Sequence, residues 1–380
     1  MTEAMIEFRE VTKVYGGATA VDRLSLTVPR GHITVFVGPS GCGKTTSLRM
    51  VNRMVEPSSG TIIVDGQDVS SLPAAKLRRS MGYVMQAAGL MPHRTVVDNI
   101  ATVPRLNGVS RRSARARARE LLDVVGLPQA LAGRYPAQLS GGQQQRVGVA
   151  RALAADPPVL LMDEPFSAVD PVVRHELQQE LLRLQRELGK TIVFVTHDID
   201  EAVLLGERIA VFAVGGRLAQ VAGPEEILRA PADDFVAGFV GRDRGFRHLG
   251  FYDDAGLAVD GAETLLKSGL SGARLAGWTV VVDDAGRPAG WASPAAPGTL
   301  VSGGSLHRAG ASLRTALDAA LSSPSGRGVV IDDDGRFVGT VGAAAVIAQA
   351  DRRRADAQRE RAESRAGSRA GAETMAGGAS

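Results

Sequence analysis

Short apolar runs alternate with longer helical patterns from Ile6 to about Val240. This alternation is typical of an α/β domain with a mainly parallel sheet. Each apolar run is short and continuous, as expected of a strand that is covered on both faces. The pattern predicts buried strands at Ile33–Val37, Val159–Met162, Ile192–Val195 and Ile209–Phe212.

Two further patterns predict subdomains beside this sheet. The segment Thr61–Val64 is followed by Asp65-Gly66, a pair typical of a tight hairpin turn, so we expect an antiparallel β layer. The stretch from about Thr95 to Arg151 is mostly helical in pattern, and Gly126 is a plausible helix stop. This stretch predicts a separate helical lobe.

An internal repeat follows Gly241. The segment Val280–Arg287 (VVVDDAGR) is similar to Val329–Arg336 (VVIDDDGR), and in each copy one strand enters an Asp/Gly turn and another leaves it. Helical patterns at Leu313–Leu321 and Val341–Ala350 flank the second copy. We interpret residues 250–350 as a paired βαββα-like module whose first copy, lacking a clean leading helix, would be degenerate.

The last thirty or so residues have a different composition. From Asp351 the chain is Arg, Ala, Glu, Gly and Ser with almost no large apolar residues. Such a segment cannot bury enough surface to offset the entropy lost on ordering. Residues 351–380 are therefore expected to form a disordered tail.

Composition narrows the class of protein. A chain of 380 residues with 44% hydrophobic residues has room for two domains. The net charge of +3 is small, so no nucleic-acid partner is expected. The single cysteine, Cys42, fits a reducing compartment. No apolar run approaches the roughly 18 residues of a membrane span, and the N-terminus lacks a signal-peptide pattern. We therefore expect a cytosolic chain whose membrane role would require a partner.

The segment from Gly38 to Thr45 (GPSGCGKT) predicts a phosphate-binding loop. It follows a predicted strand and opens a helical pattern, as G-x-x-x-x-G-K-[ST] requires. Glycines let backbone N–H groups curl around phosphate oxygens, Lys44 reaches the β/γ-phosphates and Thr45 binds Mg²⁺. The predicted ATP-binding residues here are Gly38, Pro39, Ser40, Gly41, Cys42, Gly43, Lys44, Thr45 and Thr46.

The strand Val159–Met162 ends in two acids, Asp163 and Glu164. This arrangement predicts Asp163 near Mg²⁺ and Glu164 where it can polarise a water molecule. On its own, an acidic strand end is equally consistent with a residue of no special role. The upstream phosphate loop favours the catalytic interpretation.

Between the loop and the acidic strand lies Leu139–Arg146 (LSGGQQQR). Here the chain resembles the ATP-binding cassette (ABC) family, whose signature is LSGGQ. The resemblance extends to Gln86 in a Q-loop, Ser167–Asp170 as a D-loop and His197 as the switch histidine. As a bare pentapeptide the signature would also fit a serine N-cap before a helix.

The resemblance implies a P-loop NTPase fold of the ABC type and a head-to-tail dimer. ATP on one subunit's loop would be covered by Ser140, Gly141, Gly142 and Gln143 of the other, with Asp170 nearby. Glu164 is the candidate general base, His197 holds the γ-phosphate, and Gln86 senses Mg²⁺ and the attacking water. The Mg²⁺ residues implied are Thr45, Gln86 and Asp163.

Three other features carry alternatives. Tyr15 stands where the family stacks a ring on adenine, although a core tyrosine is the alternative. The arginine run Arg111–Arg119 is interpreted as a solvated helix face rather than an RNA-binding stripe. The leucine spacing from Leu177 to Leu188 is interpreted as one buried helix face rather than a zipper.

The resemblance also indicates the kind of ABC protein. A single cassette without a membrane span or a long coiled-coil insertion fits the separate ATPase subunit of a prokaryotic importer, on the cytoplasmic face of the membrane. Its partners would be a second copy, permease subunits and, indirectly, a substrate-binding protein. The alternatives are a soluble ABC ATPase of other function and an importer of another small polar solute, such as an amino acid or polyamine.

Four stretches look like the ATPases of osmoprotectant importers, which move glycine betaine, carnitine, choline or proline betaine. Those ATPases often end in tandem CBS domains, and the repeat is similar to that module. Ser167–Val169 departs from the Gly-Ala-Leu of close relatives, which should leave Asp170 usable. The four stretches are Ile100–Val103, Tyr135–Asp156, Phe194–Glu201 and Asp234–Arg244.

We also hypothesise that the C-terminal region gates activity through salt-dependent electrostatics. The motivation is the acidic turns at Asp283-Asp284 and Asp332–Asp334, together with the basic segment Arg242–His248. Nucleotide binding by the CBS-like pair stays open as an alternative.

Overall fold

The chain divides into two compact units, residues 1–241 and 242–380, and each is described by itself. The computed structural model describes residues 3–86, 88–167, 169–241, 243–356 and 359. Among these residues no helix combines the length and the apolar character that a membrane span requires.

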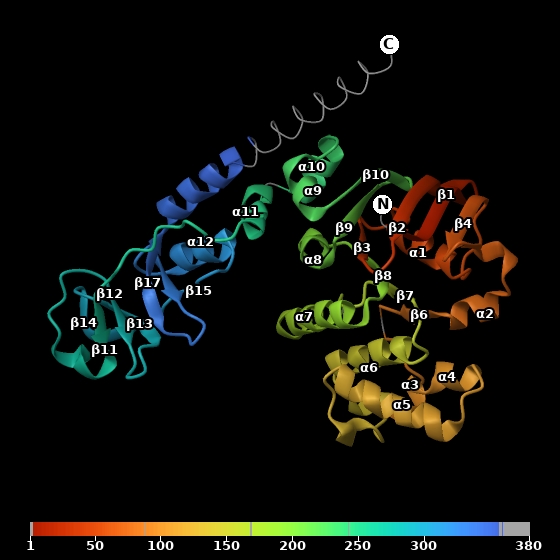
Figure 1. Ribbon diagram of the computed structural model, residues 1–380, viewed down its shortest axis with the longest axis horizontal. Coiled ribbons are helices and arrows are strands. Elements are labelled where there is room, and N and C mark those ends of the chain that lie inside the picture. The colour runs from red at the N-terminus through yellow and green to blue at the C-terminus, as the bar shows by residue number, and fades with distance from the viewer. Residues whose placement is uncertain (1–2, 87, 168, 242, 357–358, 360–380) are drawn as a thin grey trace, which may run out of the picture. The chain divides into compact units, whose positions relative to one another are not determined.

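The apolar runs form a six-stranded sheet at the centre of the first unit, in the order β10-β9-β3-β8-β7-β6 (Figure 1). All neighbours are parallel except β10 and β9. The mainly parallel sheet predicted from the sequence is confirmed. The strands are β3 (Ile33–Val37), β6 (Met81–Val84), β7 (Val159–Asp163), β8 (Thr191–Thr196), β9 (Arg208–Ala213) and β10 (Arg217–Ala222).

Both faces of this sheet are buried, which explains why its strands are apolar throughout. In β3, Val35 and Val37 pack into one core with the helical lobe, whereas Phe36 packs into a second core with the antiparallel strands. In β8, Phe194 and Val195 divide between the same two cores. Residues at the carboxyl ends of these strands are therefore held by packing on both sides.

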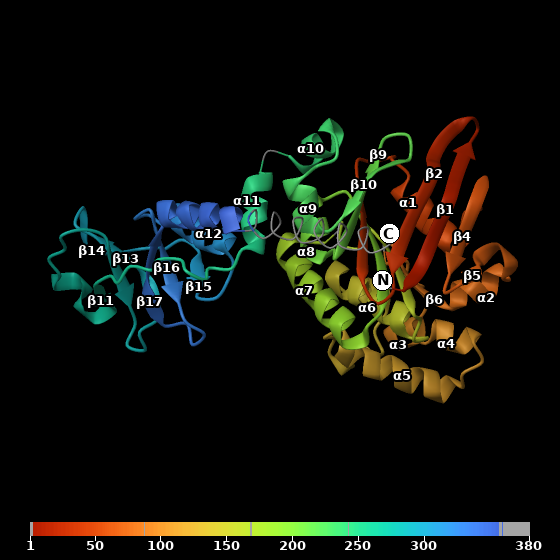
Figure 2. The ribbon, with the colours of Figure 1, turned by 45° about the horizontal axis from the view of Figure 1, so that its top comes forward.

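The predicted antiparallel layer is present as a four-stranded sheet in the order β2-β1-β4-β5, visible beside the central sheet in Figure 2. Its tight turn lies at Asp65 and Gly66, which both have positive φ, at 50° and 74°. Two positive φ values are what a two-residue hairpin turn requires. The strands are β1 (Ala4–Tyr15), β2 (Ala18–Pro29), β4 (Ser59–Val64) and β5 (Gln67–Asp68).

The predicted helical lobe is also present, between β6 and β7. Its long helix α5 ends at Val124, and Gly126 follows with a φ of 64°, as expected of a helix stop. The lobe contains α3 (Val96–Ile100), α4 (Thr102–Leu106), α5 (Arg111–Val124), η2 (Gln129–Leu131), η3 (Pro136–Gln138) and α6 (Gly141–Leu153).

The remaining helices of the first unit cover the sheets. On α7, Leu177, Leu181 and Leu184 are buried. They form one packed face, as interpreted, whereas Leu188 is exposed. The helices are α1 (Lys44–Val51), η1 (Val69–Ser71), α2 (Ala74–Arg79), α7 (Pro171–Leu188), α8 (Ile199–Leu205), α9 (Pro224–Arg229) and α10 (Asp234–Val240).

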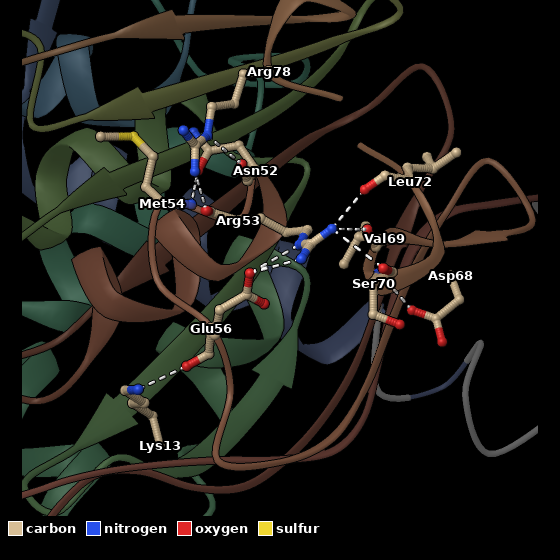
Figure 3. Close-up of polar contacts among 10 residues, drawn as sticks. All are labelled: Lys13, Asn52, Arg53, Met54, Glu56, Asp68, Val69, Ser70, Leu72 and Arg78. Atoms are coloured by element: carbon tan, nitrogen blue, oxygen red, sulfur yellow. Dashed lines mark hydrogen bonds and ion pairs between the residues drawn. The ribbon is translucent and has the colours of Figure 1, made fainter. Parts of the chain in front are cut away.

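Arg53 fixes the end of α1 against the antiparallel layer (Figure 3). Its guanidinium donates to three carbonyl oxygens in one short segment, those of Val69, Ser70 and Leu72, at 3.3, 3.2 and 2.5 Å. It also pairs with Glu56 at 2.9 Å. Since α1 follows the predicted phosphate loop, these contacts hold the helix that carries Lys44 and Thr45.

The second unit repeats one topology. In its first sheet β11 and β12 are parallel while β12 and β13 are antiparallel; in its second sheet β15 and β16 are parallel while β16 and β17 are antiparallel. The elements are α11 (Arg244–His248), η4 (Leu249–Phe251), β11 (Thr264–Leu266), η5 (Lys267–Gly272), β12 (Thr279–Val282), β13 (Pro288–Ser293), β14 (Ala296–Val301), β15 (Leu306–Arg308), α12 (Leu313–Ser322), β16 (Arg327–Ile331) and β17 (Phe337–Gly342).

The two Asp/Gly turns of the repeat share one hydrogen-bond pattern. Asp283 Oδ1 accepts from the N–H groups of Ala285 and Arg287, at 2.9 and 2.8 Å. Asp332 Oδ1 accepts from the corresponding residues, Asp334 and Arg336, at 3.0 and 2.8 Å. These two carboxylates therefore stabilise the turns. Their presence in both copies needs no salt-sensing role to explain it.

The two copies differ before their hairpins. The second copy has α12, whereas the first has only the short 3₁₀ helix η5, which contains two glycines and two serines, residues that favour turns over α-helix.

The predicted start of the disordered tail is too early. Residues 343–356 and residue 359 are helical. Arg352 bonds Gln349 Oε1 at 2.8 Å, and Arg353 bonds Asp253 and the carbonyl of Ala255. Alanine and arginine favour helix, and these polar contacts need no large apolar side chain. The rest of the predicted tail lies outside the described residues.

Candidate functional site

The segment from Gly38 to Gly43 joins β3 to α1 and is curled by its glycines. Gly38, Gly41 and Gly43 have φ values of 154°, 78° and 93°. A Cβ on Gly38 would lie 2.2 Å from the carbonyl oxygen of Phe212, and one on Gly43 would lie 2.2 Å from that of Ala20. The loop can adopt this path against its neighbours only with glycine at both positions.

Lys44 opens α1 and its ammonium group lies inside the loop. The side chain is buried, and Nζ donates to the carbonyls of Gly38 and Pro39, at 2.8 and 2.9 Å. The first N–H groups of α1 lie at the same end of the helix, so charge and donors converge on one concave backbone segment. This arrangement suits a phosphate group.

Cys42, within the same loop, is a packing residue. It is fully buried, and burial raises the pKa of its thiol although Lys44 opposes the shift. A buried thiol with a raised pKa is a poor nucleophile. The structure gives Cys42 no redox chemistry.

Asp163 stands at the carboxyl end of β7 and gathers three side chains. Its Oδ1 accepts from Thr45 Oγ1 at 2.7 Å, and its Oδ2 accepts from the Tyr83 hydroxyl at 3.1 Å and from Arg49 at 3.3 Å. Asp163 is buried at 5% exposure. A hydroxyl and a carboxylate facing each other present the hard oxygen donors that Mg²⁺ prefers. Thr45 and Asp163 therefore fit this ion.

The sequence reasoning did not identify Arg49 or Tyr83. Arg49 lies four residues after Thr45, on the same face of α1, so helical spacing could have indicated it. Tyr83 lies on β6, which pairs directly with β7. Burial raises the pKa of Tyr83 to about 12, so its hydroxyl remains a donor to Asp163 at neutral pH.

Glu164 and His197 meet at the ends of neighbouring strands. Glu164 follows β7, His197 follows β8, and Glu164 Oε2 lies 3.1 Å from His197 Nδ1. Glu164 has a φ of 46°, which is costly for a residue with a Cβ, and its N–H donates to the carbonyl of Val195 at 3.1 Å. Packing on both sheet faces holds this strained geometry, which aims the carboxylate toward His197.

Three further residues predicted to bind nucleotide or Mg²⁺ lie beside this arrangement. Tyr15 ends β1, is 48% exposed, and has Lys13 Nζ 4.8 Å from its ring centroid. The ring is therefore no core residue and is open to stacking. Gln86 is exposed just after β6, the strand that neighbours β7. Thr46 lies within the first turn of α1.

The signature segment begins α6. Ser140 Oγ accepts from the N–H of Gln143 at 3.3 Å, and Gln143 Oε1 accepts from the N–H of Ser140 at 3.0 Å, forming a capping box. The hydroxyl hydrogen of Ser140 takes no part in this box and can point outward. The side-chain carbonyl of Gln143 serves the cap of its own helix, which leaves its amide nitrogen for the predicted contact with nucleotide.

The two glycines of the signature have different surroundings. A Cβ on Gly142 would lie 2.7 Å from Val173 Cγ1 of α7, whereas one on Gly141 would meet nothing within 4 Å. Asp170 is exposed and caps α7 by accepting from the N–H of Val172 at 3.0 Å. Its neighbour Ala168 lies outside the described residues.

The phosphate loop and the signature begin two different helices. Figures 1 and 2 show α1 beside the antiparallel strands and α6 in the helical lobe. At the carboxyl ends of β3, β8 and β7, which are neighbours in that order, the structure pairs Thr45 with Asp163 and Glu164 with His197. Ser140 and Asp170 lie at the starts of α6 and α7.

Comparison with known proteins agrees with this geometry. The sequence profile of the ABC transporter family matches residues 21–167. The chain is 52% identical over 241 residues to the carnitine transport ATP-binding protein OpuCA of Listeria monocytogenes, covering 63% of this chain and 60% of the relative. It is 54% identical over 238 residues to the glycine betaine uptake system ATP-binding protein YehX of Escherichia coli, covering 63% of this chain and 77% of the relative.

Solved structures show the same cassette. The dimeric post-hydrolysis state of the ATP-binding cassette MJ0796, bound to ADP and Pi, is 35% identical with a TM-score of 0.54, covering 58% of this chain and 99% of that one. CbiO1 of Clostridium perfringens, part of the ABC transporter complex CbiONQ, is 29% identical with a TM-score of 0.56, covering 60% and 92%. The chain, which spans only 60% of the OpuCA relative's length, belongs to the ABC transporter family of ATP-binding proteins.

Proposed function

We propose that this chain is the ATPase subunit of an ABC importer, and that it hydrolyses ATP as a head-to-tail dimer with a second copy. The observation that carries this proposal is the meeting of Glu164 and His197, 3.1 Å apart, at the ends of β7 and β8, of which β8 pairs with the strand that leads into the phosphate loop. A base, a cationic loop and a histidine in this arrangement suit phosphoryl transfer to water.

The roles follow from the contacts. Lys44 and the loop amides hold the β- and γ-phosphates. Thr45 and Asp163, with Gln86, would hold Mg²⁺, which would supply charge neutralisation at the phosphate oxygens. Glu164 accepts the proton of the attacking water as the water oxygen bonds to the γ-phosphorus, while the bond from that phosphorus to the β–γ bridging oxygen breaks and ADP leaves. His197 orients Glu164 and contacts the γ-phosphate, and Tyr15 stacks on adenine.

The second copy completes the site. Ser140 of the partner can donate its hydroxyl hydrogen to the γ-phosphate, because the capping box uses only its oxygen as acceptor. Gly141 is open to an approaching ligand and Gly142 keeps the segment close to α7. Asp170 lies at the start of the same helix, α7. The dimeric state of the relative MJ0796 supports this arrangement.

We propose that the imported solute is a quaternary-amine osmoprotectant such as glycine betaine, carnitine, choline or proline betaine. The relatives named for carnitine and glycine betaine, at 52% and 54% identity, support this class. The second candidate is another small polar solute, such as an amino acid or polyamine, because cassette similarity does not fix the cargo: an Fe(3+) ions import ATP-binding protein of Rhizobium meliloti is 46% identical over 236 residues. Cassette similarity alone therefore spans several cargoes.

The contact with permease subunits is proposed at the helical lobe. A groove of about 530 Å³ lies there, and its lining carries Arg94, Arg105, Arg111 and Arg115 around a single acid, Asp98. Asp98 is bound by Arg115 at 2.6 Å, and this bond holds the pKa of the carboxyl below its usual value. The groove thus keeps an excess of positive charge. Through this contact the chain would sit at the cytoplasmic face of the membrane.

The second unit is proposed to be a regulatory CBS-like pair. Support comes from the repeated topology and the shared turn geometry of its two copies. A salt-dependent role rests on the exposed acids that the turns do not use, such as Asp284 and Asp333. Removing the residues after about 245 should abolish the response of transport to ionic strength, and an unchanged response would exclude the idea.

The decisive experiment is reconstitution. The chain is purified with the permease subunits that copurify with it, placed in vesicles with the cognate binding protein, and tested for ATP-dependent uptake of glycine betaine, carnitine and choline against an amino acid and a polyamine. Uptake of a quaternary amine alone supports the proposal. Uptake of only the amino acid or the polyamine would favour the second candidate solute. Absence of ATP hydrolysis would refute the proposed ATPase function.

A further inference from the structure

A buried chain of hydrogen bonds runs behind the predicted switch histidine. Glu201 Oε2 accepts from Thr196 Oγ1 at 2.6 Å, and Glu201 Oε1 accepts from Gln178 Nε2 at 3.0 Å. Thr196 Oγ1 in turn accepts from the N–H of Asp198 at 3.0 Å. Thr196, Gln178 and Glu201 are all buried, at 2%, 6% and 9% exposure.

Backbone and side-chain donors meet at this network. The N–H of Asp198 can only donate, so it occupies one lone pair of the Thr196 oxygen and leaves the hydroxyl hydrogen available to Glu201. The amide nitrogen of Gln178 also donates, so both carboxylate oxygens act as acceptors. Both carboxylate oxygens of Glu201 are thus occupied by side chains from β8 and α7.

The surroundings of Glu201 make its burial costly. Desolvation raises the pKa of its carboxyl, the bond from Thr196 opposes that shift, nearby Asp198 adds to it, and Gln178 and Arg174 oppose it. A well-packed apolar residue would avoid this cost. A buried carboxylate kept at such a cost is expected to do something that an apolar residue cannot.

The role of Glu201 follows from the residue at the far end of this hydrogen-bond network. Asp198 directly follows His197, so the bond from its amide to Thr196 fixes the turn between β8 and α8 that carries the imidazole. The imidazole in turn lies 3.1 Å from Glu164. A shift of about 1 Å at a catalytic group can reduce a rate by about 100-fold.

The same hydrogen-bond network also includes a residue of the helix that begins at the predicted D-loop. Gln178 lies on α7, which starts at the Asp170 cap. On the same helix Arg174 donates to the carbonyl of Val169 at 3.2 Å. Glu201 is thus the point where α7, β8 and the start of α8 are joined by polar contacts.

We propose that Glu201 is a positioning residue for ATP hydrolysis: through Thr196 it holds His197 in register with Glu164, and through Gln178 it ties that turn to α7. This inference deepens the proposed function and rests on it. The alternative is that the cluster merely fastens α8 to α7, in which case its loss would lower stability without changing the chemical step.

The test compares matched variants of the full chain. Thr196→Val keeps the shape of the side chain and removes the hydroxyl, while Thr196→Ser keeps the hydroxyl. We expect Thr196→Val to lower kcat for ATP by about ten- to hundredfold with little change in KM, measured well below a melting temperature that the two lost hydrogen bonds also reduce. Thr196→Ser should restore most of that loss.

A swapped pair provides the second test. Glu201→Gln places an amide group against a donor, since either Thr196 or Gln178 then loses its acceptor. In the double variant Gln178→Glu, Glu201→Gln the glutamine oxygen faces Thr196 and its amide donates to the new carboxylate, so acceptors and donors match again. We expect the double variant to be faster than Glu201→Gln, which also covers the case in which Thr196→Val does not fold.

A thermodynamic cycle with His197→Ala identifies the route of action. If Glu201 acts through His197, Thr196→Val should cost little further rate once the imidazole is gone. A full additional loss in that background, normal kcat for Thr196→Val and Glu201→Gln, or a loss confined to melting temperature would each overturn the inference. Absence of hydrolysis by the unmodified protein would instead refute the proposed function.

Discussion

The carboxylate of Glu164 faces the imidazole of His197 across two adjacent strand ends, with Oε2 3.1 Å from Nδ1. The contact exists although Glu164 must hold a φ of 46° to make it. Strain kept by packing on both sides of a sheet is typical of catalytic residues. This pair is the part of the site from which the chemical predictions follow.

Glu164→Gln should retain ATP binding and lower turnover by about 10²- to 10⁴-fold, because the amide cannot accept a proton from water. The unhydrolysed nucleotide should then trap the dimer. Steady-state hydrolysis and equilibrium ATP binding on the same preparation are the measurements. Near-normal hydrolysis would remove Glu164 from the role of base.

Lys44→Ala should act at an earlier step. The ammonium lies within the curve of the loop, 2.8 Å from the carbonyl oxygen of Gly38, where phosphate oxygens would bind. Its removal should weaken ATP binding or hydrolysis without creating a trapped dimer. Titration with a fluorescent ATP analogue measures the first effect, and the prediction fails if affinity and rate both match the unmodified protein.

Two alanine substitutions in the loop should separate strain from steric clash. Gly41→Ala meets no neighbour within 4 Å, so only its φ of 78° opposes alanine, at about 1–2 kcal/mol. Gly43→Ala should destabilise more, because its Cβ would lie 2.2 Å from the backbone oxygen of Ala20. Urea unfolding of both variants measures the difference, and equal losses would contradict the loop geometry.

Arg151 should be important for the Q-loop. Its guanidinium donates to the carbonyls of Ala88 and Gly89, both at 2.7 Å, from the helix that the signature begins. Arg151→Met leaves these carbonyls without their donors, which should cost about 2–4 kcal/mol of stability. Arg119→Met, on the exposed face of α5, is the control and should change stability by less than about 0.5 kcal/mol. Similar values for the two variants would refute the role.

Much of the first unit could be predicted because its information is local. The four buried strands are continuous apolar runs, and the turn at Asp65-Gly66 needs two residues that tolerate positive φ. The loop at Lys44 is recognisable because its chemistry requires glycines at fixed spacing before a helix. These features do not depend on which distant segments come together.

The rest depends on contacts between distant segments. Tyr83 and Asp163 are 80 residues apart in sequence, and only the pairing of β6 with β7 brings them together. The bond from the Ser140 N–H to Gln143 Oε1 is a local capping contact that the signature motif alone does not distinguish from a ligand contact. After Asp351, composition indicated disorder, yet Arg353 contacts a segment about a hundred residues earlier.

In the proposed dimer, one copy's phosphate loop is completed by the other copy's signature segment. A direct test introduces Ser40→Cys and Ser140→Cys together in a chain that also carries Cys42→Ser and Glu164→Gln, followed by mild oxidation. We expect a disulfide-linked dimer on a denaturing gel with Mg-ATP, little of it with ADP, and none from chains carrying either new cysteine alone. Absence of the linked dimer with ATP, or equal yield with ADP, would contradict the shared site.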